Sequence, residues 1–120
     1  MVDARYRVMI FLKRRPGMAV AEFRDYYENH HLPLVRRYAS GLADYRRSYI
    51  RWLDHLDTHE PCEAQFDVVT ELIYDDKTKL ESLIGMVERG RLPDDVLQDE
   101  FLLFDRAATR YVVVEQEDQG

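Results

Sequence analysis

The order of strand-like and helical segments constrains the fold of this chain more than any other feature of its sequence. Four segments are rich in β-branched and aromatic residues, as strands are, and turn-forming or polar residues bound them. These are residues 5–13, 45–52, 66–74 and 110–116. Between them, apolar residues recur every three or four positions, which is the period of one helix face. These helical segments are residues 20–38 and 75–90, with a shorter one at 93–103.

The order of these segments predicts an α+β domain with the split βαβ topology of ferredoxin-like folds. Its sheet has four antiparallel strands, and its helices lie on one face. Residues 1–120 make one domain of ordinary length, in which 117–120 form a frayed tail. Because Pro33 lacks an amide donor, we expect it to break or kink the first helix close to His30 and His31.

Both faces of the predicted sheet are apolar. The pattern assigns one set of residues to the face under the helices: Val8, Ile10, Val68, Leu72, Val112 and Val114. The alternate positions form the other face: Met9, Phe11, Val69, Ile73, Tyr111 and Val113. Because helices cover only one face, the second must be buried against something else. We therefore predict a homodimer that associates through its sheet faces.

Composition excludes several classes of function. The net charge of −6 opposes a nucleic-acid partner, because phosphate neutralisation supplies most of the affinity in such complexes. Cys62 is the only cysteine, so neither an intrachain disulfide nor a thiolate metal cluster is available. No stretch approaches the roughly 20 apolar residues of a membrane span, and residues 1–20 lack the pattern of a secretion signal. We expect a cytoplasmic protein with no membrane partner.

Motifs for cofactors and metals are also missing. The sequence has no glycine-rich nucleotide loop and no serine-hydrolase elbow, so we expect no cofactor. His55 and His59 have the spacing of two zinc ligands on a helix, but the accompanying glutamate is missing and Pro61 indicates a loop. We therefore expect no metal site there.

The stretch FLKRRPGMAVAEFRDYYENHHLPLV, residues 11–35, resembles the EthD family of dimeric α+β barrel proteins. The resemblance lies in a strand that leads into KRRPG, then Phe23, Tyr27 and His31, and then the run Pro33-Leu34-Val35. It continues in FDVVTELIYDD, residues 66–76, and in QDEFLLFD, residues 98–105. It implies a homodimer whose two sheets face each other as a barrel, with a pocket between each sheet and its own helices.

The resemblance does not fix an activity. The founding member of the family is associated with bacterial ether degradation, and fungal relatives look like dehydratases acting on polyketides. Neighbouring families of the same barrel include cofactor-free monooxygenases, polyketide cyclases and lactone isomerases, and a fold alone does not decide among such functions. Whether this chain is an enzyme stays open. If it is, the resemblance implies a lyase of the dehydratase type or an isomerase.

His31 is the candidate catalytic residue, because the family histidine falls on it by its spacing from Phe23. An imidazole at a helix bend with aromatic neighbours can act as a general acid or base near neutral pH. The alternative is a structural role, in which His31 caps the broken helix or bonds a backbone carbonyl. We expect His30 to face solvent.

Aromatic side chains are the candidate substrate-binding groups: Tyr26, Tyr27, Tyr45, Tyr49 and Trp52. Their flat faces and polar tips suit a planar aromatic ligand, although tyrosine at such spacing is common in plain cores. Asp67 and Glu71 are possible supporting charges. They lie about 13 Å apart along one strand face, too far to act on one bond, and ion pairs with arginines such as Arg47, Arg51 and Arg110 are the favoured alternative.

Two functional hypotheses follow. The first is a cofactor-independent enzyme that transfers protons in dehydration, isomerisation or cyclisation of an apolar aromatic or polyketide-like small molecule. The second is a noncatalytic small-molecule binder or an accessory protein of a catabolic or biosynthetic pathway. Cofactor-free monooxygenation is a further alternative.

Overall fold

The computed structural model describes residues 6–39 and 41–117. The predicted start of the first strand at Arg5 and the predicted tail beyond Glu117 lie outside the described residues. The elements follow one another as β1 (Tyr6–Leu12), α1 (Val20–Tyr26), η1 (Tyr27–His31), α2 (Leu32–Tyr38), β2 (Leu42–Tyr49), β3 (Val68–Tyr74), α3 (Lys77–Glu88), α4 (Asp94–Leu103), η2 (Arg106–Ala108) and β4 (Arg110–Glu115).

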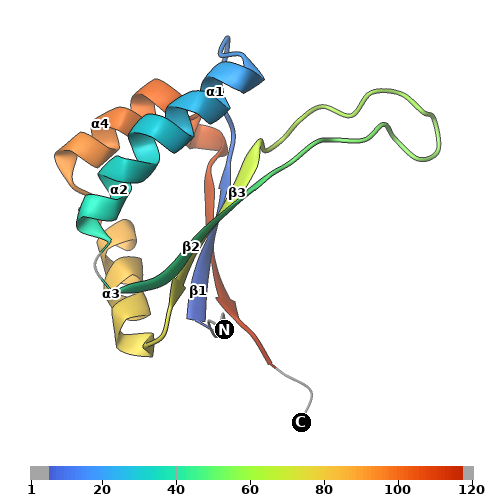
Figure 1. Cartoon of the computed structure of the whole chain (residues 1–120). Helices are drawn as coiled ribbons and strands as arrows, with labels where there is room; N and C mark the ends of the chain where they lie inside the picture. The colour runs from blue at the N-terminus through green and yellow to red at the C-terminus, as the bar shows by residue number, and fades with distance from the viewer. Residues whose placement is uncertain (1–5, 40, 118–120) are drawn as a thin grey trace.

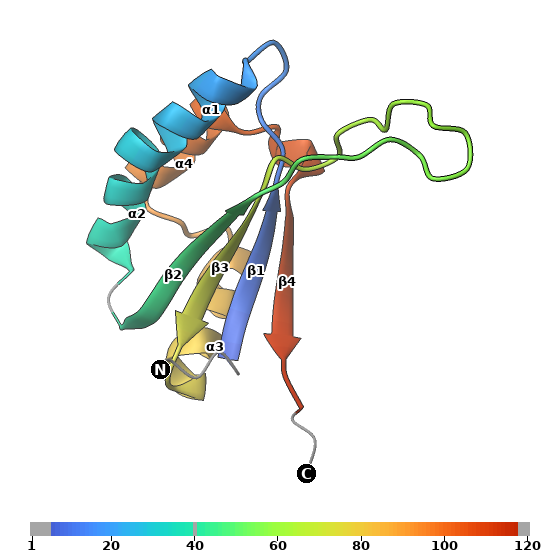
Figure 2. The same ribbon diagram turned by 45° about the vertical axis from the view of Figure 1, so that its right-hand side comes forward.

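The strands form one sheet in the order β2-β3-β1-β4, and each neighbouring pair is antiparallel. The helices α1, α2, α3 and α4 pack on one side of this sheet (Figures 1 and 2). This arrangement confirms the predicted α+β fold with a four-stranded antiparallel sheet. In the part of the chain that the structure describes, no helix is long and apolar enough to cross a membrane.

The first helical segment does not break at Pro33. It runs from α1 through one π-helical turn, η1, into α2, where Pro33 occupies the first turn. The amide of Leu32 donates to the carbonyl of Tyr27, five residues earlier, so the turn is one residue wider than an α-helical turn. The prediction was a break or a kink. The helix does not break, but it is irregular at the predicted place, where the wide turn accommodates the missing donor of proline and holds His31 at its end.

β2 ends at Tyr49, three residues before the predicted end at Trp52. Tyr49 pairs with Val68, the first residue of β3, so the chain beyond it has no neighbouring strand to bond. One further hydrogen bond, from the amide of Ile50 to the carbonyl of Asp67 at 3.0 Å, closes the base of a long connection. This connection extends away from the sheet and helices (Figure 1), and residues 50–61 are exposed throughout.

The core lies between the sheet and the helices. β1 contributes Val8, Ile10 and Leu12, which alternate along the strand and are each at most 8% exposed. Across from them, Phe23 of α1 and Leu103 of α4 are completely buried. We call the sheet side that carries Val8 the helix face, and the opposite side the outer face.

Register shows which residues of β4 belong to each face. Val113 pairs with Val8 and Tyr111 with Ile10, so both lie on the helix face. Val112 pairs with Met9, so it lies on the outer face, and Val114 lies there with it. The predicted faces of β4 were wrong, because the run Tyr-Val-Val-Val is apolar at every position and its polarity does not distinguish the two sides.

Candidate functional site

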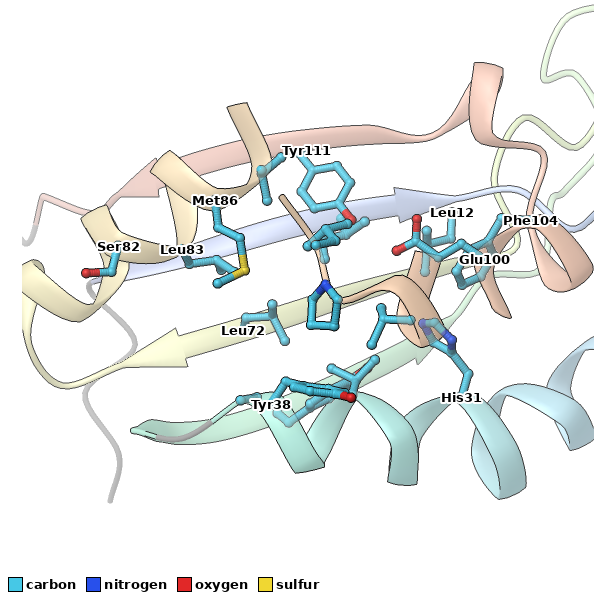
Figure 3. Close-up of a pocket in the computed structure, with 18 of the residues that line it drawn as sticks. Leu12, His31, Tyr38, Leu72, Ser82, Leu83, Met86, Glu100, Phe104 and Tyr111 are labelled. Atoms are coloured by element: carbon cyan, nitrogen blue, oxygen red, sulfur yellow. The ribbon is translucent and has the colours of Figure 1, made fainter. Parts of the chain in front are cut away.

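A cavity of about 280 Å³ lies between the helix face of the sheet and the helices, close to the lower end of the usual range for small-molecule sites. Its wall is mainly apolar: the sheet supplies Ile10, Leu12 and Leu72, and the helical side supplies Val35, Leu83, Met86, Val87, Leu92, Pro93, Val96 and Phe104. Figure 3 shows the labelled polar side chains at its two ends. His31 and Glu100 lie at one end, and Ser82 lies at the other.

His31 closes one end of the cavity. The π-helical turn holds its ring against Tyr27 and Phe104, at centroid distances of 5.5 Å and 5.1 Å in edge-to-face contacts. Only 4% of the residue is exposed. Burial lowers the pKa of its imidazole, and the hydrogen bond to Asp99 opposes that effect without cancelling it. His31 is therefore a neutral imidazole at neutral pH.

Asp99 of α4 orients the imidazole. The Nδ1 of His31 donates to Oδ2 of Asp99 at 2.8 Å, because a carboxylate accepts and so fixes the proton on this nitrogen. Among the described residues no hydrogen bond engages Nε2, which keeps its lone pair on the side of the cavity that His31 lines. A neutral imidazole with a free Nε2 beside a cavity can accept a proton from a bound molecule.

Tyr26 extends this chain of contacts on the side away from the cavity. Its hydroxyl donates to Oδ1 of Asp99, and this hydrogen bond, with burial, raises the pKa of Tyr26 to about 12. Tyr26 thus stays protonated and holds Asp99 in place. The hydrogen bonds of Tyr26 and His31 to Asp99 join α1 and η1 to α4, although His31 and Asp99 are 68 positions apart in the sequence.

Glu100, the next residue of α4, lines the cavity and is 7% exposed. Burial raises the pKa of its carboxyl, and the nearby Arg106, whose Nε donates to Oε1 at 3.3 Å, only partly offsets that effect. Glu100 is not among the site residues predicted from the sequence. A signal exists, however: Val96, Glu100 and Leu103 share the buried stripe of α4, so an acidic residue stands on an apolar helix face.

Three hydroxyl groups form a buried cluster at the floor of the cavity. The hydroxyls of Tyr27 and Tyr45 lie 2.9 Å apart, and that of Tyr27 also bonds the hydroxyl of Thr70. Burial raises the pKa of Tyr27 and of Tyr45, so both are neutral donors and acceptors. Tyr27 and Tyr45 line the cavity together with His31.

The other aromatic candidates lie outside the cavity wall. Tyr49 donates to Oε2 of Glu28 at 2.7 Å, and the guanidinium of Arg24 lies 4.2 Å from its ring centroid. Trp52 lies on the long connection after β2, where its indole donates to the carbonyl of Phe66 at 2.7 Å. The structure thus brings together His31, Tyr27 and Tyr45 at one wall.

Asp67 and Glu71 also lie away from the cavity. Asp67 is buried at the start of β3, where it accepts from the amide of Arg14 at 2.8 Å and pairs with the guanidinium of the same residue. Glu71 lies on the outer face, 3.1 Å from Nε of Arg7. Both carboxylates make ion pairs that join strands or strand ends.

Within the described ranges, no group of three or more histidine, cysteine, aspartate or glutamate side chains is placed to hold a metal ion. His55, His59 and Cys62 lie on the long connection after β2, remote from the cavity wall.

Comparison with known proteins agrees with the fold. The family model of the EthD domain matches residues 15–89, which is more than half of the chain. Asp99 and Glu100 lie beyond the matched segment. No curated protein matches the chain.

Two solved structures have the same fold. An EthD family protein from Bacillus halodurans is 23% identical, with a TM-score of 0.60 over 93% of this chain and 99% of its own. The protein At3g17210 from Arabidopsis thaliana gives a TM-score of 0.60 at 5% identity, over 96% of this chain and 98% of its own. At such low identities these matches concern the fold alone.

Proposed function

Because this chain belongs to the EthD family, whose activity the fold leaves open, we propose its function from the cavity itself. We infer that it is a cofactor-independent enzyme that binds an apolar aromatic or polyketide-like molecule and transfers a proton to or from it. Dehydration, isomerisation and cyclisation are the reactions that need only such a step. The observation that carries this proposal is the contact between Nδ1 of His31 and Asp99 at 2.8 Å, beside a cavity of about 280 Å³.

The chemistry follows from the state of the imidazole. His31 is neutral and Asp99 fixes its tautomer, so Nε2 is the basic atom. When Nε2 takes a proton, the positive charge that forms lies next to the carboxylate of Asp99, which stabilises it in an environment of low dielectric. The mainly apolar side chains around the cavity favour an uncharged ligand.

A noncatalytic binding protein is the second candidate, and one observation favours it. The contacts of Asp99 with His31 and Tyr26 also join the first helix to α4, so they can serve the fold alone. In that case the cavity holds a ligand for another protein of the pathway, and His31 contributes shape and a hydrogen bond but no proton transfer.

We also propose that the protein is a homodimer through the outer face of its sheet. The register brings Met9, Phe11, Val69 and Val112 to that face, and all four helices α1–α4 pack on the other side (Figure 2). Val112 is 42% exposed. An apolar sheet face of this kind is favourable only when another surface covers it.

The first test measures ligand binding by thermal unfolding at fixed protein concentration. Naphthols, anthrones and aromatic lactones are the ligands, with wild type, His31→Gln and His30→Gln compared. A ligand that binds the native state at about 100 times its Kd adds about 2.7 kcal/mol of stability. We expect a stabilising ligand for wild type, a smaller shift for His31→Gln, and a wild-type shift for His30→Gln, since His30 is exposed.

The same ligands distinguish the two candidates by turnover. An enzyme converts at least one bound compound, and His31→Gln abolishes that conversion while the variant still folds. A binding protein holds the compound unchanged. If His31→Gln and wild type bind every compound equally, the ligand does not contact His31 and the proposed site is wrong.

A further inference from the structure

The cavity wall carries a carboxyl group, that of Glu100, which the proposed function does not use. Asp99 and Glu100 are consecutive on α4, so their side chains leave the helix about 100° apart. Asp99 points to His31 and Tyr26, whereas Glu100 lines the cavity. Figure 3 shows the carboxyl of Glu100 and the ring of His31 at the same end of the cavity, with Ser82 at the opposite end.

The surroundings of Glu100 favour its neutral form. Phe104 and Val96 flank it on the cavity wall, and the residue is 7% exposed. The charged and titratable groups that act on it are Arg106 from η2, Asp99 from α4 and Tyr111 from β4, and His31 from η1 lies at the same end of the cavity. Of these, Arg106 alone is a permanent cation, its contact is 3.3 Å long, and its own side chain is 40% exposed to water.

We propose that Glu100 is the proton donor of this site, and that the site acts on an uncharged carbonyl compound held between Glu100 and Nε2 of His31. This inference rests on the proposed function, in which His31 is the base. A buried carboxyl group on an apolar cavity wall is an acid that is placed to give its proton to a bound molecule. Asp99, one residue away, is engaged with His31 and Tyr26, so the two carboxyls have different roles.

The step balances within the site. Nε2 of His31 removes a proton from the carbon next to the carbonyl group, and the electrons of that C–H bond form a C=C bond. The π electrons of the carbonyl move to its oxygen, which takes the proton of Glu100 and becomes an enol hydroxyl. His31 is then a cation and Glu100 an anion. In a β,γ-unsaturated carbonyl compound this enol is a dienol. Its hydroxyl returns a proton to Glu100, and His31 gives its proton to the far carbon of the dienol, so the C=C bond moves into conjugation with the re-formed carbonyl group. The net reaction is an isomerisation and consumes no other reactant.

Glu100 and His31 together define the class of substrate. A ligand carboxylate next to Glu100 would meet the charge of Asp99 and find Arg106 already engaged with Glu100. A neutral ketone or lactone meets an acid at its oxygen and a base at its carbon. An apolar remainder fits most of the rest of the wall, to which Lys79 and Ser82 contribute polar groups.

The test uses two probe substrates. Both need a base to remove a proton, but they differ in how much they need an acid to protonate the leaving phenolate. In benzisoxazole, removal of the ring C–H breaks the N–O bond and leaves a cyanophenolate, which a donor protonates. The nitro derivative releases a far less basic phenolate, so its reaction depends little on a donor. We expect Glu100→Gln to lower the rate with benzisoxazole about 100-fold, and to change the rate with the nitro derivative much less. The exposed Glu81→Gln is the matched control and keeps both rates.

Each result separates the two proposals. His31→Gln should slow both probes equally, because both need the base. If wild type is no faster than His31→Gln with either probe, the base itself is wrong and the proposed function fails with the inference. If His31→Gln is slow but Glu100→Gln slows both probes equally or neither, the function stands and the donor assignment is overturned.

A measurement on the resting protein tests the same point independently of turnover. Glutamate labelled at the side-chain carboxyl gives one resonance per residue, and the one missing from Glu100→Gln belongs to Glu100. We expect this resonance to be that of a protonated carboxyl at a pH where the other glutamates are carboxylates. A Glu100 that ionises together with them contradicts the inference.

Discussion

The two nitrogen atoms of His31 have different surroundings, and this difference is the basis of the proposed chemistry. Nδ1 is fixed on Asp99 at 2.8 Å, whereas Nε2 belongs to the cavity. The resemblance to the EthD family implied His31, with the register set by its spacing from Phe23. The sequence did not predict Asp99 as the partner, because 68 residues separate the two and only the packing of α4 against η1 brings them together. A pair of this kind forms only through tertiary packing, and no local sequence pattern predicts it.

The stability of the protein should depend on pH through His31. Burial lowers the pKa of His31 in the native state below its ordinary value of 6.5, so the unfolded chain binds the proton more strongly. The contribution of His31 to the free energy of unfolding is therefore fully present above about pH 6.5 and falls as the pH drops through the native pKa. Each unit of lowering is worth about 1.4 kcal/mol.

Urea unfolding between about pH 5 and about pH 8 measures this contribution. The loss of stability on the acid side should be smaller in His31→Gln than in wild type. His30→Gln, which changes an exposed histidine on the same turn, should follow the wild-type curve. Equal pH dependence in all three proteins would mean that His31 is not buried as a neutral imidazole.

Among the elements, the strands and helices were predicted in their correct order, and the errors have local causes. β2 was expected to reach Trp52 because the residues after Tyr49 are aromatic and β-branched, but β3 begins opposite Tyr49 and offers them no partner. The π-helical turn was not predicted, because residues 27–31 alone do not distinguish i−5 from i−4 hydrogen bonding. Pro33 indicated only that the helix is irregular near His31.

The first helix depends on Phe23 for its packing. This side chain is completely buried and makes edge-to-face contacts with Tyr27 and Phe104, the two residues that support the His31 ring. Phe23→Ala should lower the free energy of unfolding by about 3–5 kcal/mol. Val20→Ala, on the same helix with 58% exposure, should change it by no more than about 0.5 kcal/mol. Chemical denaturation of both variants checks this, and similar effects would contradict the described packing.

Within residues 6–39 and 41–117, the sheet has one face under helices and one face without them. The apolar character of both faces could be predicted from the sequence, because β1 and β3 alternate two sets of apolar residues. The face to which each residue of β4 belongs could not, since its central residues are apolar throughout. The outer face gives the homodimer its proposed interface, and the cavity lies on the opposite side of the sheet in each subunit.

Adjacent valines of β4 test the dimer. Val112 and Val113 have similar exposures, 42% and 46%, but lie on the outer face and the helix face respectively. Val112→Asp should place a charge in the dimer interface and give a protein of half the mass by light scattering, because an unpaired buried charge is costly. Val113→Asp should remain a dimer. A wild-type protein that is a monomer at micromolar concentration, or a dimeric Val112→Asp, would show that this face is not the interface.

The long connection between β2 and β3 starts and ends at one hydrogen-bonded pair, Ile50 with Asp67. Trp52 and Phe66 add contacts at the base of this connection: the indole of Trp52 donates to the carbonyl of Phe66, and the ring of Phe66 packs against Phe11. The exposed residues 53–61 beyond these contacts can therefore change in length or composition while the strands that carry Tyr45 and Thr70 keep their register. The protein is in this sense modular. The exposed part of this connection can diverge or accept a grafted peptide or label. Such a change should not alter the cavity wall, because no residue of this connection lines it.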